Sequence, residues 1–315
     1  MRYSHLFGPV LSRRLGRSLG VDLVPFKVCS FDCVYCECGD TTKVVLEREE
    51  FFPGEEVLDE LEDYLSRSPV LDFITFSGSG EPTLSLSIGM CIRYLKERLP
   101  SYRVAVLTNG TLLWKEDVRR DLLEADIVLP TLSSAIEETY RRIHRPAPGL
   151  PVELIIAGIE QFRKDYTGEI WLEIFIIPGI NTTKTELEAL RKAIRQIHPD
   201  RVQLNTLDRP GTESWVRPAS PGELRKVRDM LGLAGVESVE PVIPGSFRCI
   251  PVPEWTDSVM MVLDLLQRRP STLEDIIDVT GLNRREVLKI LRVIGARFPV
   301  TEKKEERGIF YSCPP

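Results

Sequence analysis

Three closely spaced cysteines, Cys29, Cys33 and Cys36, have the residue type and the spacing to bind a metal cluster. They follow an apolar stretch over residues 20–26 that predicts a β-strand, so one loop can direct three thiolates toward one point. Three thiolates suit three corners of a cubane [4Fe–4S] cluster, and the fourth iron is then left without a cysteine. Such an open iron is what a cluster needs in order to activate a bound molecule, whereas a cluster that only transfers electrons normally has four cysteines.

Two other roles for these cysteines remain open. A structural zinc site needs four ligands, and Cys38, the nearby fourth cysteine, is separated from Cys36 by one residue, which is closer than paired zinc ligands usually are. Disulfides are less favoured, because seven cysteines in 315 residues, with no signal peptide, do not form the dense, even-numbered framework of a small secreted domain. We therefore expect a cluster in preference to zinc or a disulfide.

A second loop, over residues 77–82, contains residue types that suit a small ligand. Its glycines and serines let backbone N–H groups approach a ligand closely, and its carboxylate could pair with an ammonium group. A turn of this composition at the end of a strand is also a common structural feature. The residues of this candidate binding loop are Ser77, Gly78, Ser79, Gly80, Glu81 and Pro82.

Regularly alternating strands and helices must position these two loops. Amphipathic helices are predicted near residues 57–65, 88–99, 115–123, 152–164 and 183–197. Ser220 with Glu223, and Thr183 with Glu186, have the spacing of capping boxes. Six such units predict an α/β fold with a parallel sheet, closed or partly closed into a barrel, and with its chemistry at the carboxyl ends of the strands. The predicted strands are residues 20–26, 71–76, 102–107, 126–130, 170–177 and 201–205.

Taken together, the two loops resemble those of the radical S-adenosylmethionine (SAM) superfamily. Tyr35 precedes the last cysteine, and residues 79–82 are similar to the Gly-Gly-Glu-Pro motif of that superfamily, with serine in place of the first glycine. The resemblance covers about residues 10–235 and implies a partial (β/α)6 barrel of the TIM type. It also implies that SAM binds the open iron, and that an electron from a ferredoxin- or flavodoxin-like donor cleaves SAM. The product is a 5′-deoxyadenosyl radical that abstracts hydrogen from the substrate.

The resemblance implies further contacts by position in the chain. Ser133 or Ser134 corresponds to a ribose contact, residues 176–181 to a segment against adenine, and residues 108–110 to the mouth of the same site. Arginines before the first strand, one arginine near residue 145 and the fourth cysteine are candidates for substrate or carboxylate contacts, with surface ion pairs as the alternative for the arginines. The additional candidate residues are Asn109, Ser133, Ile176 and Asn181 for SAM, and Arg13, Arg14, Arg17, Cys38 and Arg145 for the substrate.

A narrower resemblance concerns residues 8–36. They are similar to a group of archaeal and bacterial iron–sulfur oxidoreductases that is loosely related to the wyosine-base (tRNA) synthases. Those synthases have a second cluster, whereas the remaining cysteines of this chain lack metal-ligand spacing. We therefore expect a single cluster. The remaining cysteines are Cys38, Cys91, Cys249 and Cys313.

The pattern changes after about residue 240. Prolines are crowded between residues 241 and 253, and three helical patterns follow with no strand between them. The second and third are joined by a glycine turn and an asparagine cap, Thr280 to Asn283, as in a helix-turn-helix, and residues 300–311 could form a β-wing. The sequence thus predicts a barrel domain over residues 1–240, a linker over residues 241–254 and a winged-helix domain over residues 255–315.

The predicted winged helix is locally basic. Between Gly281 and Arg307, eight basic residues and four acidic ones give a local charge of +4 on a chain whose net charge is −6. The basic residues could touch the phosphates of a nucleic acid, although a protein or peptide partner, a lid and a dimer contact remain open. The basic residues are Arg284, Arg285, Lys289, Arg292, Arg297, Lys303, Lys304 and Arg307.

Composition agrees with a cytoplasmic enzyme. Hydrophobic residues make up 43% of the chain, which suffices for a large core, and no apolar stretch has the length of a membrane span. Two functions remain: a radical SAM enzyme of unassigned substrate, and a redox-sensing regulator whose cluster controls DNA binding. We favour the enzyme, because a sensor needs neither a β/α barrel nor a Gly-Glu-Pro loop. The sequence does not predict the oligomeric state.

Overall fold

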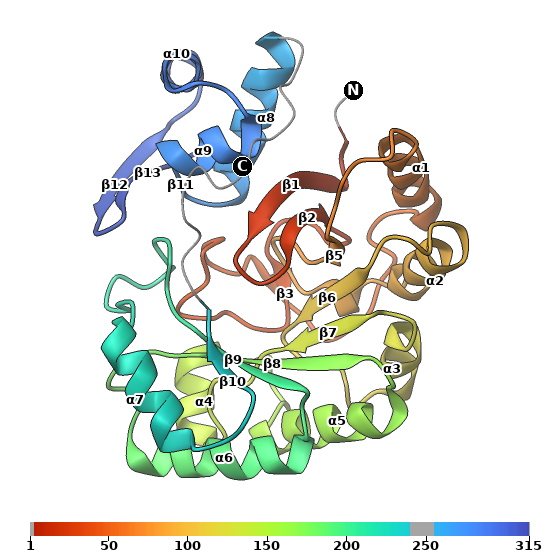
Figure 1. Ribbon diagram of the computed structural model, residues 1–315, viewed down its shortest axis with the longest axis vertical. Coiled ribbons are helices and arrows are strands. Elements are labelled where there is room, and N and C mark those ends of the chain that lie inside the picture. Colours follow the sequence, from red (N-terminus) through yellow and green to blue (C-terminus); the bar gives the residue numbers. More distant parts are fainter. Residues whose placement is uncertain (1–2, 240–254, 315) are drawn as a thin grey trace.

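An eight-stranded sheet organises most of the chain in the computed structural model, which describes residues 3–239 and 255–314. The first two strands form an antiparallel hairpin, and each later strand is parallel to its neighbour. The carboxyl ends of these parallel strands therefore lie together at what we call the carboxyl edge of the sheet. The strand order is β1 (Leu6–Ser12), β2 (Gly16–Val21), β5 (Phe73–Phe76), β6 (Val104–Thr108), β7 (Ile127–Pro130), β8 (Glu169–Phe175), β9 (Arg201–Asn205) and β10 (Val236–Ser238) (Figure 1).

The two faces of the sheet bury different sets of apolar side chains, because successive residues of a strand point to opposite sides. Ile74 and Val128 join the main hydrophobic core with the helices. Phe73 and Ile127 join a smaller core on the other face, together with Leu15 from the turn of the hairpin. The helices of the outer layer are α1 (Gly54–Leu65), α2 (Ile88–Arg98), α3 (Glu116–Leu122), α4 (Glu137–His144), α5 (Val152–Asp165), α6 (Lys184–Ile197) and α7 (Pro221–Leu231).

All six predicted strands are present, and the first is displaced along the chain. It covers Gly16–Val21 rather than residues 20–26, because the chain leaves the sheet after Val21 and forms a short strand, β3 (Val28–Cys29), beside β4 (Lys43–Val44). The strands β1 and β10 and the helix α4 were not predicted. In β1, a glycine and a proline interrupt the apolar pattern, and the strand pairs with an irregular register between Phe7 and Val10.

The C-terminal part contains three helices and a small sheet with a hydrophobic core of its own. The helices are α8 (Trp255–Arg268), α9 (Leu273–Thr280) and α10 (Arg284–Gly295), as the sequence predicts. Asn283 caps α10 by accepting hydrogen bonds from two backbone N–H groups. The strands β11 (Ser271–Thr272), β12 (Thr301–Glu305) and β13 (Gly308–Ser312) form the small sheet, in which β12 and β13 are the predicted hairpin. The prediction of no strand between the helices was wrong, because the two residues of β11 lie between α8 and α9 and pair with β13.

The C-terminal part lies against the hairpin β1–β2 (Figure 1). Val10 of β1 packs on its core, and α9 contacts β1. The predicted proline-rich linker lies outside the described residues, so the domain division stays a prediction. In the described part of the chain, no helix is long and apolar enough to cross a membrane.

Candidate active site

The cysteine loop is fastened to its surroundings mainly by backbone hydrogen bonds. Cys29 ends β3 and its carbonyl accepts a hydrogen bond from the N–H of Val45 at 2.9 Å. Asp32 and Val34 donate their N–H groups to the carbonyls of His144 and Ile143, at 3.0 Å each. The unpredicted helix α4 thus holds the loop at the carboxyl edge of the sheet, because these two carbonyls lie at its end.

Each of the three predicted cluster cysteines lies beside one nitrogen of another side chain. Lys27 Nζ is 3.0 Å from Cys36 Sγ, and His144 Nδ1 is 3.3 Å from Cys33 Sγ. Asn109 Nδ2 is 3.5 Å from Cys29 Sγ and also donates to Ser30 Oγ at 2.8 Å. Each thiol therefore has a nitrogen-bearing side chain beside it, and these three side chains come from separate segments of the chain.

The thiols and Lys27 interact electrostatically. A hydrogen bond from Cys38 and the nearby Lys27 ammonium lower the pKa of Cys36 to about 6, although burial opposes the shift. Burial raises the pKa of Cys29 to about 12 and that of Cys33 well above its usual value. Burial opposes the charge of Lys27, but the thiolates outweigh it and raise the pKa of Lys27, which favours its cationic form.

These residues fit a [4Fe–4S] cluster. The three thiols come from one loop and lie near enough to influence the ionisation of one another, and a buried cation beside them offsets the negative charge of a thiolate-ligated cluster. Cys38 interacts with Cys36 in the same loop. Among the described residues, no three His, Cys, Asp or Glu side chains converge on a point that could hold a single metal ion.

The candidate binding loop packs directly on the cysteine loop. A side chain on Gly80 would lie 2.1 Å from the carbonyl oxygen of Val28, so glycine is required at this contact. Gly78 has φ of +132° and faces the carboxylate of Asp22. Ser77 donates its N–H to the carbonyl of Val21 at 3.1 Å. The two loops are therefore direct neighbours, because Glu81 also donates its N–H to the carbonyl of Val28 at 3.1 Å.

Glu81 is buried and its hydrogen-bonding capacity is used within the protein. Its carboxylate accepts hydrogen bonds from the N–H and hydroxyl of Thr83, the hydroxyl of Thr108 and the N–H of Asn109, at 2.6 to 3.1 Å. Burial raises its pKa against these bonds. Oε1 accepts three of these bonds and Oε2 accepts one, so Glu81 joins its own loop to the end of β6. Pro82 continues the loop as the first residue of a short 3-10 helix, Pro82–Leu84.

Ser79 connects the binding loop to the C-terminal part of the chain. Its N–H and hydroxyl donate to Asp22 Oδ2 at 3.3 and 3.1 Å, and Arg268 of α8 reaches the same oxygen at 2.9 Å. Arg268 also lies over the ring of Phe7. Burial raises the pKa of Asp22 against the effect of Arg268. The spacing of these residues gives no signal that Asp22 and Arg268 meet, because they are 246 residues apart in the chain.

The residues predicted to contact ribose and adenine are buried and bonded to one another. Asn181 donates to the carbonyls of Ser133 and Phe175 at 2.8 and 2.7 Å and accepts from the N–H of Ile177. The hydroxyl of Ser133 accepts a hydrogen bond from the N–H of Phe175. The N–H of Ile176 donates to the carbonyl of Asn205 at 2.7 Å. These side chains hold the ends of β7 and β8 together, and their direct contact with SAM stays a prediction.

Tyr35 stacks on Phe175 with 3.8 Å between the ring centroids. Burial raises the pKa of Tyr35 well above its usual value, so its hydroxyl stays protonated. It also lies edge-on to His144, which contacts Cys33. The aromatic residue before the last cysteine therefore braces the cysteine loop against the end of β8.

The predicted substrate arginines lie in different places. Arg14, in the turn between β1 and β2, pairs with Glu173 of β8, and Arg13 lies 4.0 Å from Asp208. Arg145 pairs with Asp32 and Glu213 at the cysteine loop.

Arg17 is not brought to the site. It pairs with Asp72 at the amino end of β5, opposite the cysteines, because β2 begins earlier than predicted.

Several site residues escaped the sequence analysis. Lys27 is separated from Cys29 by a single residue, but nothing in the sequence marks it as buried. His144 has no local signal in the sequence, because its contact with Cys33 spans 111 residues. Asp22 and Glu173 interrupt apolar strand patterns, which was an available signal, because a charged residue inside a buried strand often has a specific partner.

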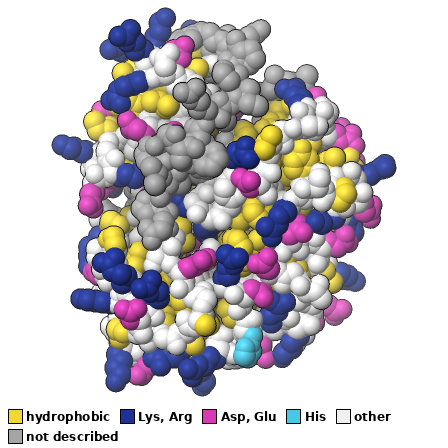
Figure 2. Space-filling view, in the orientation of Figure 1, with side chains coloured by type: hydrophobic (Ala, Val, Ile, Leu, Met, Phe, Trp, Pro, Cys, Tyr) yellow, Lys and Arg dark blue, Asp and Glu magenta, His cyan; other side chains and the backbone are white. Residues whose placement is uncertain are grey.

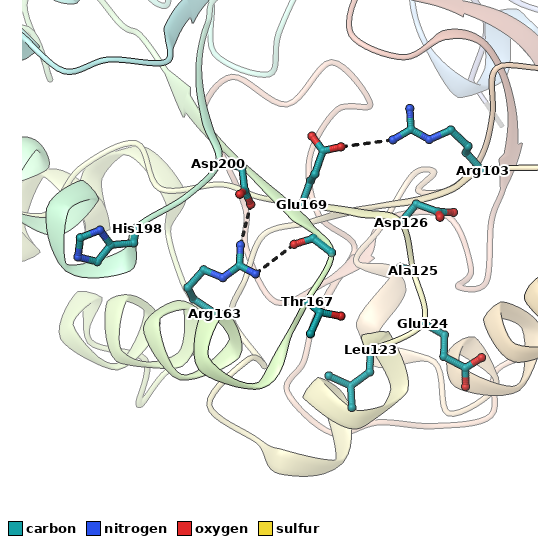
Figure 3. Close-up of a pocket in the computed structure, with 11 residues that line it drawn as sticks. Arg103, Leu123, Glu124, Ala125, Asp126, Arg163, Thr167, Glu169, His198 and Asp200 are labelled. Carbon is teal, nitrogen blue, oxygen red and sulfur yellow. Dashed lines mark hydrogen bonds and ion pairs between the residues drawn. The ribbon is translucent and has the colours of Figure 1, made fainter.

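A cavity of about 660 Å³ lies at the other end of the sheet (Figure 3). It is lined by residues at the amino ends of β6 to β9, and it includes none of the predicted site residues. Several of its charged groups pair within the protein: Arg163 bonds Asp200 at 2.6 Å and Arg103 lies 3.5 Å from Glu169.

The sequence that contains the fold and the two loops matches a known protein family. Residues 23–195 match the model of the family described as the radical SAM superfamily. The chain therefore belongs to the radical SAM superfamily, whose members use a [4Fe–4S] cluster and SAM. This confirms the predicted family, enzyme class and cofactors and leaves the substrate open.

Two individual proteins are similar in sequence to this chain. A UPF0026 protein of Methanocaldococcus jannaschii is 35% identical over 224 residues, which cover 70% of this chain and 69% of that protein. A protein of Brachyspira hyodysenteriae called GTPase Obg is 36% identical over 228 residues, 72% of this chain, but the chain spans only 33% of that protein's length.

A solved structure shares the fold. The structure of a radical SAM methyltransferase from Sphaerobacter thermophilus has a TM-score of 0.54 and 18% identity, with 70% of this chain and 65% of that chain covered. At this identity the likeness concerns the fold alone.

Proposed function

We propose that this chain binds a [4Fe–4S] cluster through Cys29, Cys33 and Cys36 and SAM beside residues 77–82, and abstracts hydrogen from a substrate at the carboxyl edge of the sheet. When bound, the cluster and SAM supply a 5′-deoxyadenosyl radical, with the electron coming from a ferredoxin- or flavodoxin-like donor. The residues of the chain hold both groups, orient them and exclude water. A reducing compartment such as the cytoplasm suits thiols that must remain free for the cluster.

A hydrogen-bond chain between the two loops carries this proposal. Glu81 of the binding loop accepts the N–H of Asn109 at 2.7 Å, and the Asn109 amide reaches Ser30 at 2.8 Å and Cys29 at 3.5 Å. Loops that serve unrelated roles do not need such a connection. Its presence supports a joint site in which the position of SAM is fixed relative to the cluster.

The test is anaerobic reconstitution with iron and sulfide, followed by SAM and dithionite. We expect about four irons per chain and formation of 5′-deoxyadenosine, measured by chromatography, and we expect neither from Cys33→Ala. Cys91→Ala, a matched change in the core of α2, should retain both. Wild-type protein that holds iron but forms no 5′-deoxyadenosine, or a Cys33→Ala variant as active as wild type, would contradict the proposal.

We further propose that residues 255–315 form a winged-helix domain that recruits an RNA substrate. The order of α8, α9, α10 and the hairpin β12–β13 supports the winged helix. Residues 1–240 would then be the catalytic domain and residues 241–254 the linker.

The charges of α10 support the choice of a nucleic acid. Arg285, Lys289 and Arg292 are exposed at positions that share one face of α10, around the partly exposed Leu288. Figure 2 shows Lys and Arg side chains at the end of the molecule where Figure 1 places α10. Other basic residues of this part contact acidic side chains: Arg284 pairs with Glu274, Lys303 with Glu305, and Arg307 with Asp208 and Asp275.

The RNA proposal is tested by the binding of unmodified tRNA at several salt concentrations. The double variant Arg285→Glu, Arg292→Glu should bind at least about tenfold more weakly. The slope of its log affinity against log salt concentration should become shallower by the amount expected for the loss of about two phosphate contacts. Lys226→Glu, a charge reversal at an exposed position of α7, is the control and should bind as wild type. Equal affinities of the double variant and the wild type would exclude α10 as the RNA contact and favour a protein partner.

A further inference from the structure

The three predicted cluster thiols each have one nitrogen donor from a different segment. Lys27 precedes β3, His144 ends α4 and Asn109 follows β6. Their nitrogens lie 3.0, 3.3 and 3.5 Å from the sulfurs of Cys36, Cys33 and Cys29. A hydrogen bond to a ligating sulfur withdraws electron density from a cluster, and such bonds are one of the means by which proteins set cluster potentials.

Lys27 is held in place by the backbone. Its backbone φ of +57° is a left-handed conformation that residues other than glycine rarely adopt. The residue is only 2% exposed. Its carbonyl accepts the N–H groups of Thr42 and Lys43 at 3.0 and 3.3 Å, which fixes the turn that directs the side chain toward the thiols. A long cationic side chain would normally extend into solvent, so its burial here indicates a specific partner.

His144 is fixed by its packing. The ring is fully buried and stacks on Phe31 with 4.7 Å between centroids, with Tyr35 and Tyr140 around it. A hydrogen bond to a thiolate requires the proton on Nδ1, which leaves Nε2 as the acceptor. Among the described residues, Nε2 has no hydrogen-bond partner. The ring can therefore act toward Cys33 without a competing bond.

We propose that Lys27 and His144 are positioning residues that raise the reduction potential of the cluster. Lys27 contributes a full charge and a hydrogen bond, and His144 contributes a neutral hydrogen bond, so the effect of Lys27 is the larger. The inference rests on the proposed function, because it requires that Cys33 and Cys36 bind the cluster. It adds the residues that tune the electron transfer which starts the reaction.

The test is a redox titration of the reconstituted cluster without SAM, followed by electron paramagnetic resonance, after iron and sulfide have been measured. Lys27→Met should shift the midpoint potential to a more negative value, and His144→Phe should shift it in the same direction by less. Lys27→Arg retains the charge and should restore most of the potential. Lys96→Met removes the lysine that binds Asp126 at the amino end of β7, and it should leave the potential unchanged.

The outcomes separate the two proposals. If wild-type protein takes up no cluster, the proposed function fails. If wild type and Lys27→Met both hold a full cluster with the same potential, the tuning role is wrong while the proposed function stands. Loss of iron from Lys27→Met but not from Lys27→Arg supports the charge role, and loss from both variants contradicts it.

Discussion

Glu81 illustrates how a buried carboxylate can join two loops of a candidate site. An acidic side chain after two glycines suggested a partner for an ammonium group, yet both carboxylate oxygens receive hydrogen bonds from Thr83, Thr108 and Asn109. Because the acceptors and donors match, the buried carboxylate fixes the relative positions of two loops. Its contribution to SAM binding would then come from the geometry of those loops.

Replacing Glu81 with glutamine should disturb this arrangement. Glu81→Gln turns one acceptor oxygen into an N–H2 group that faces existing donors, so the free energy of unfolding should fall by about 1–3 kcal/mol. Iron uptake should also decrease, since Asn109 loses its anchor near Cys29. Urea unfolding and iron analysis measure the two effects. Glu47→Gln at an exposed position should change neither, and equal behaviour of the two variants would contradict the assigned role.

At the scale of residues, the sequence predicted the groups that act through local spacing. Cys29, Cys33 and Cys36 lie on one loop, so their spacing is visible in the chain. Lys27 could not be predicted, because its role depends on a left-handed turn that buries it. His144 could not be predicted either, since its partner is 111 residues away.

At the scale of elements, the starts of helices could be predicted best, because a capping box lies within four consecutive residues. Ser220 and Glu223 form the predicted capping box of α7, with both reciprocal hydrogen bonds present. The second predicted box is only half formed. Thr183 accepts the N–H of Glu186, but the Glu186 carboxylate accepts a hydrogen bond from the hydroxyl of Ser134 at 2.7 Å. A tertiary partner has thus replaced the local one.

Removal of the α7 cap gives a prediction at this scale. Ser220→Ala loses the acceptor for the N–H of Glu223, and caps of this kind contribute about 1 kcal/mol. We expect the free energy of unfolding, measured with urea, to fall by about that amount, with iron content unchanged. Ser214→Ala, at an exposed loop position, should fall within about 0.5 kcal/mol of wild type. A loss in Ser220→Ala no larger than in this control would contradict the capping role.

Strands were predicted where their apolar pattern is continuous. β9 covers the predicted residues 201–205 without a difference. β1 was missed because Gly8 and Pro9 lie inside it, and because a hairpin edge does not need a regular pattern. The arginines before the first predicted strand consequently took unexpected positions, with Arg17 at the far end of the sheet.

At the scale of the whole molecule, ion pairs and polar contacts hold the C-terminal part on the sheet. Arg209 follows β9, is 9% exposed, and donates to Asp275 of α9 and to the carbonyl of Pro270 at 2.5 and 2.9 Å. Arg307, between β12 and β13, pairs with Asp208 and Asp275. The sequence predicted two parts, but no pattern in it encodes how they meet, because each contact joins residues far apart in the chain.

Asp275 provides a pH-dependent test of this docking. Burial alone would raise its pKa, but Arg209 and Arg307 outweigh burial and lower the pKa to about 2. A depressed carboxyl pKa stabilises the folded state above the unfolded pKa of 3.8, and this contribution is lost as the pH falls toward 2. Asp275→Asn should therefore destabilise the C-terminal part by about 3 kcal/mol at pH 7 and by much less near pH 2.

Hydrogen exchange of α9 and α10 measures this effect directly. The exchange of their amides should be faster in Asp275→Asn than in wild type at pH 7, after correction for the intrinsic rates. Glu274→Gln, which removes the exposed pair with Arg284 on the same helix, should change exchange only slightly. If the Asp275→Asn effect were the same at both pH values, the ion pairs would not be its cause.

The contact of Arg268 with Asp22 and Ser79 predicts which residues should vary together among related chains. Asp22 is buried beside the binding loop, and a buried carboxylate without its cation is costly, so Asp22 should not be tolerated without Arg268. Positions 22 and 268 should therefore change together among related chains: where the arginine is lost, the acid should be replaced by a neutral residue. An alignment of relatives that keep Asp22 with no basic residue at position 268 would refute this expectation. If recombination replaces the C-terminal part with one that lacks a basic residue at position 268, we therefore expect Asp22 of the first part to be replaced as well.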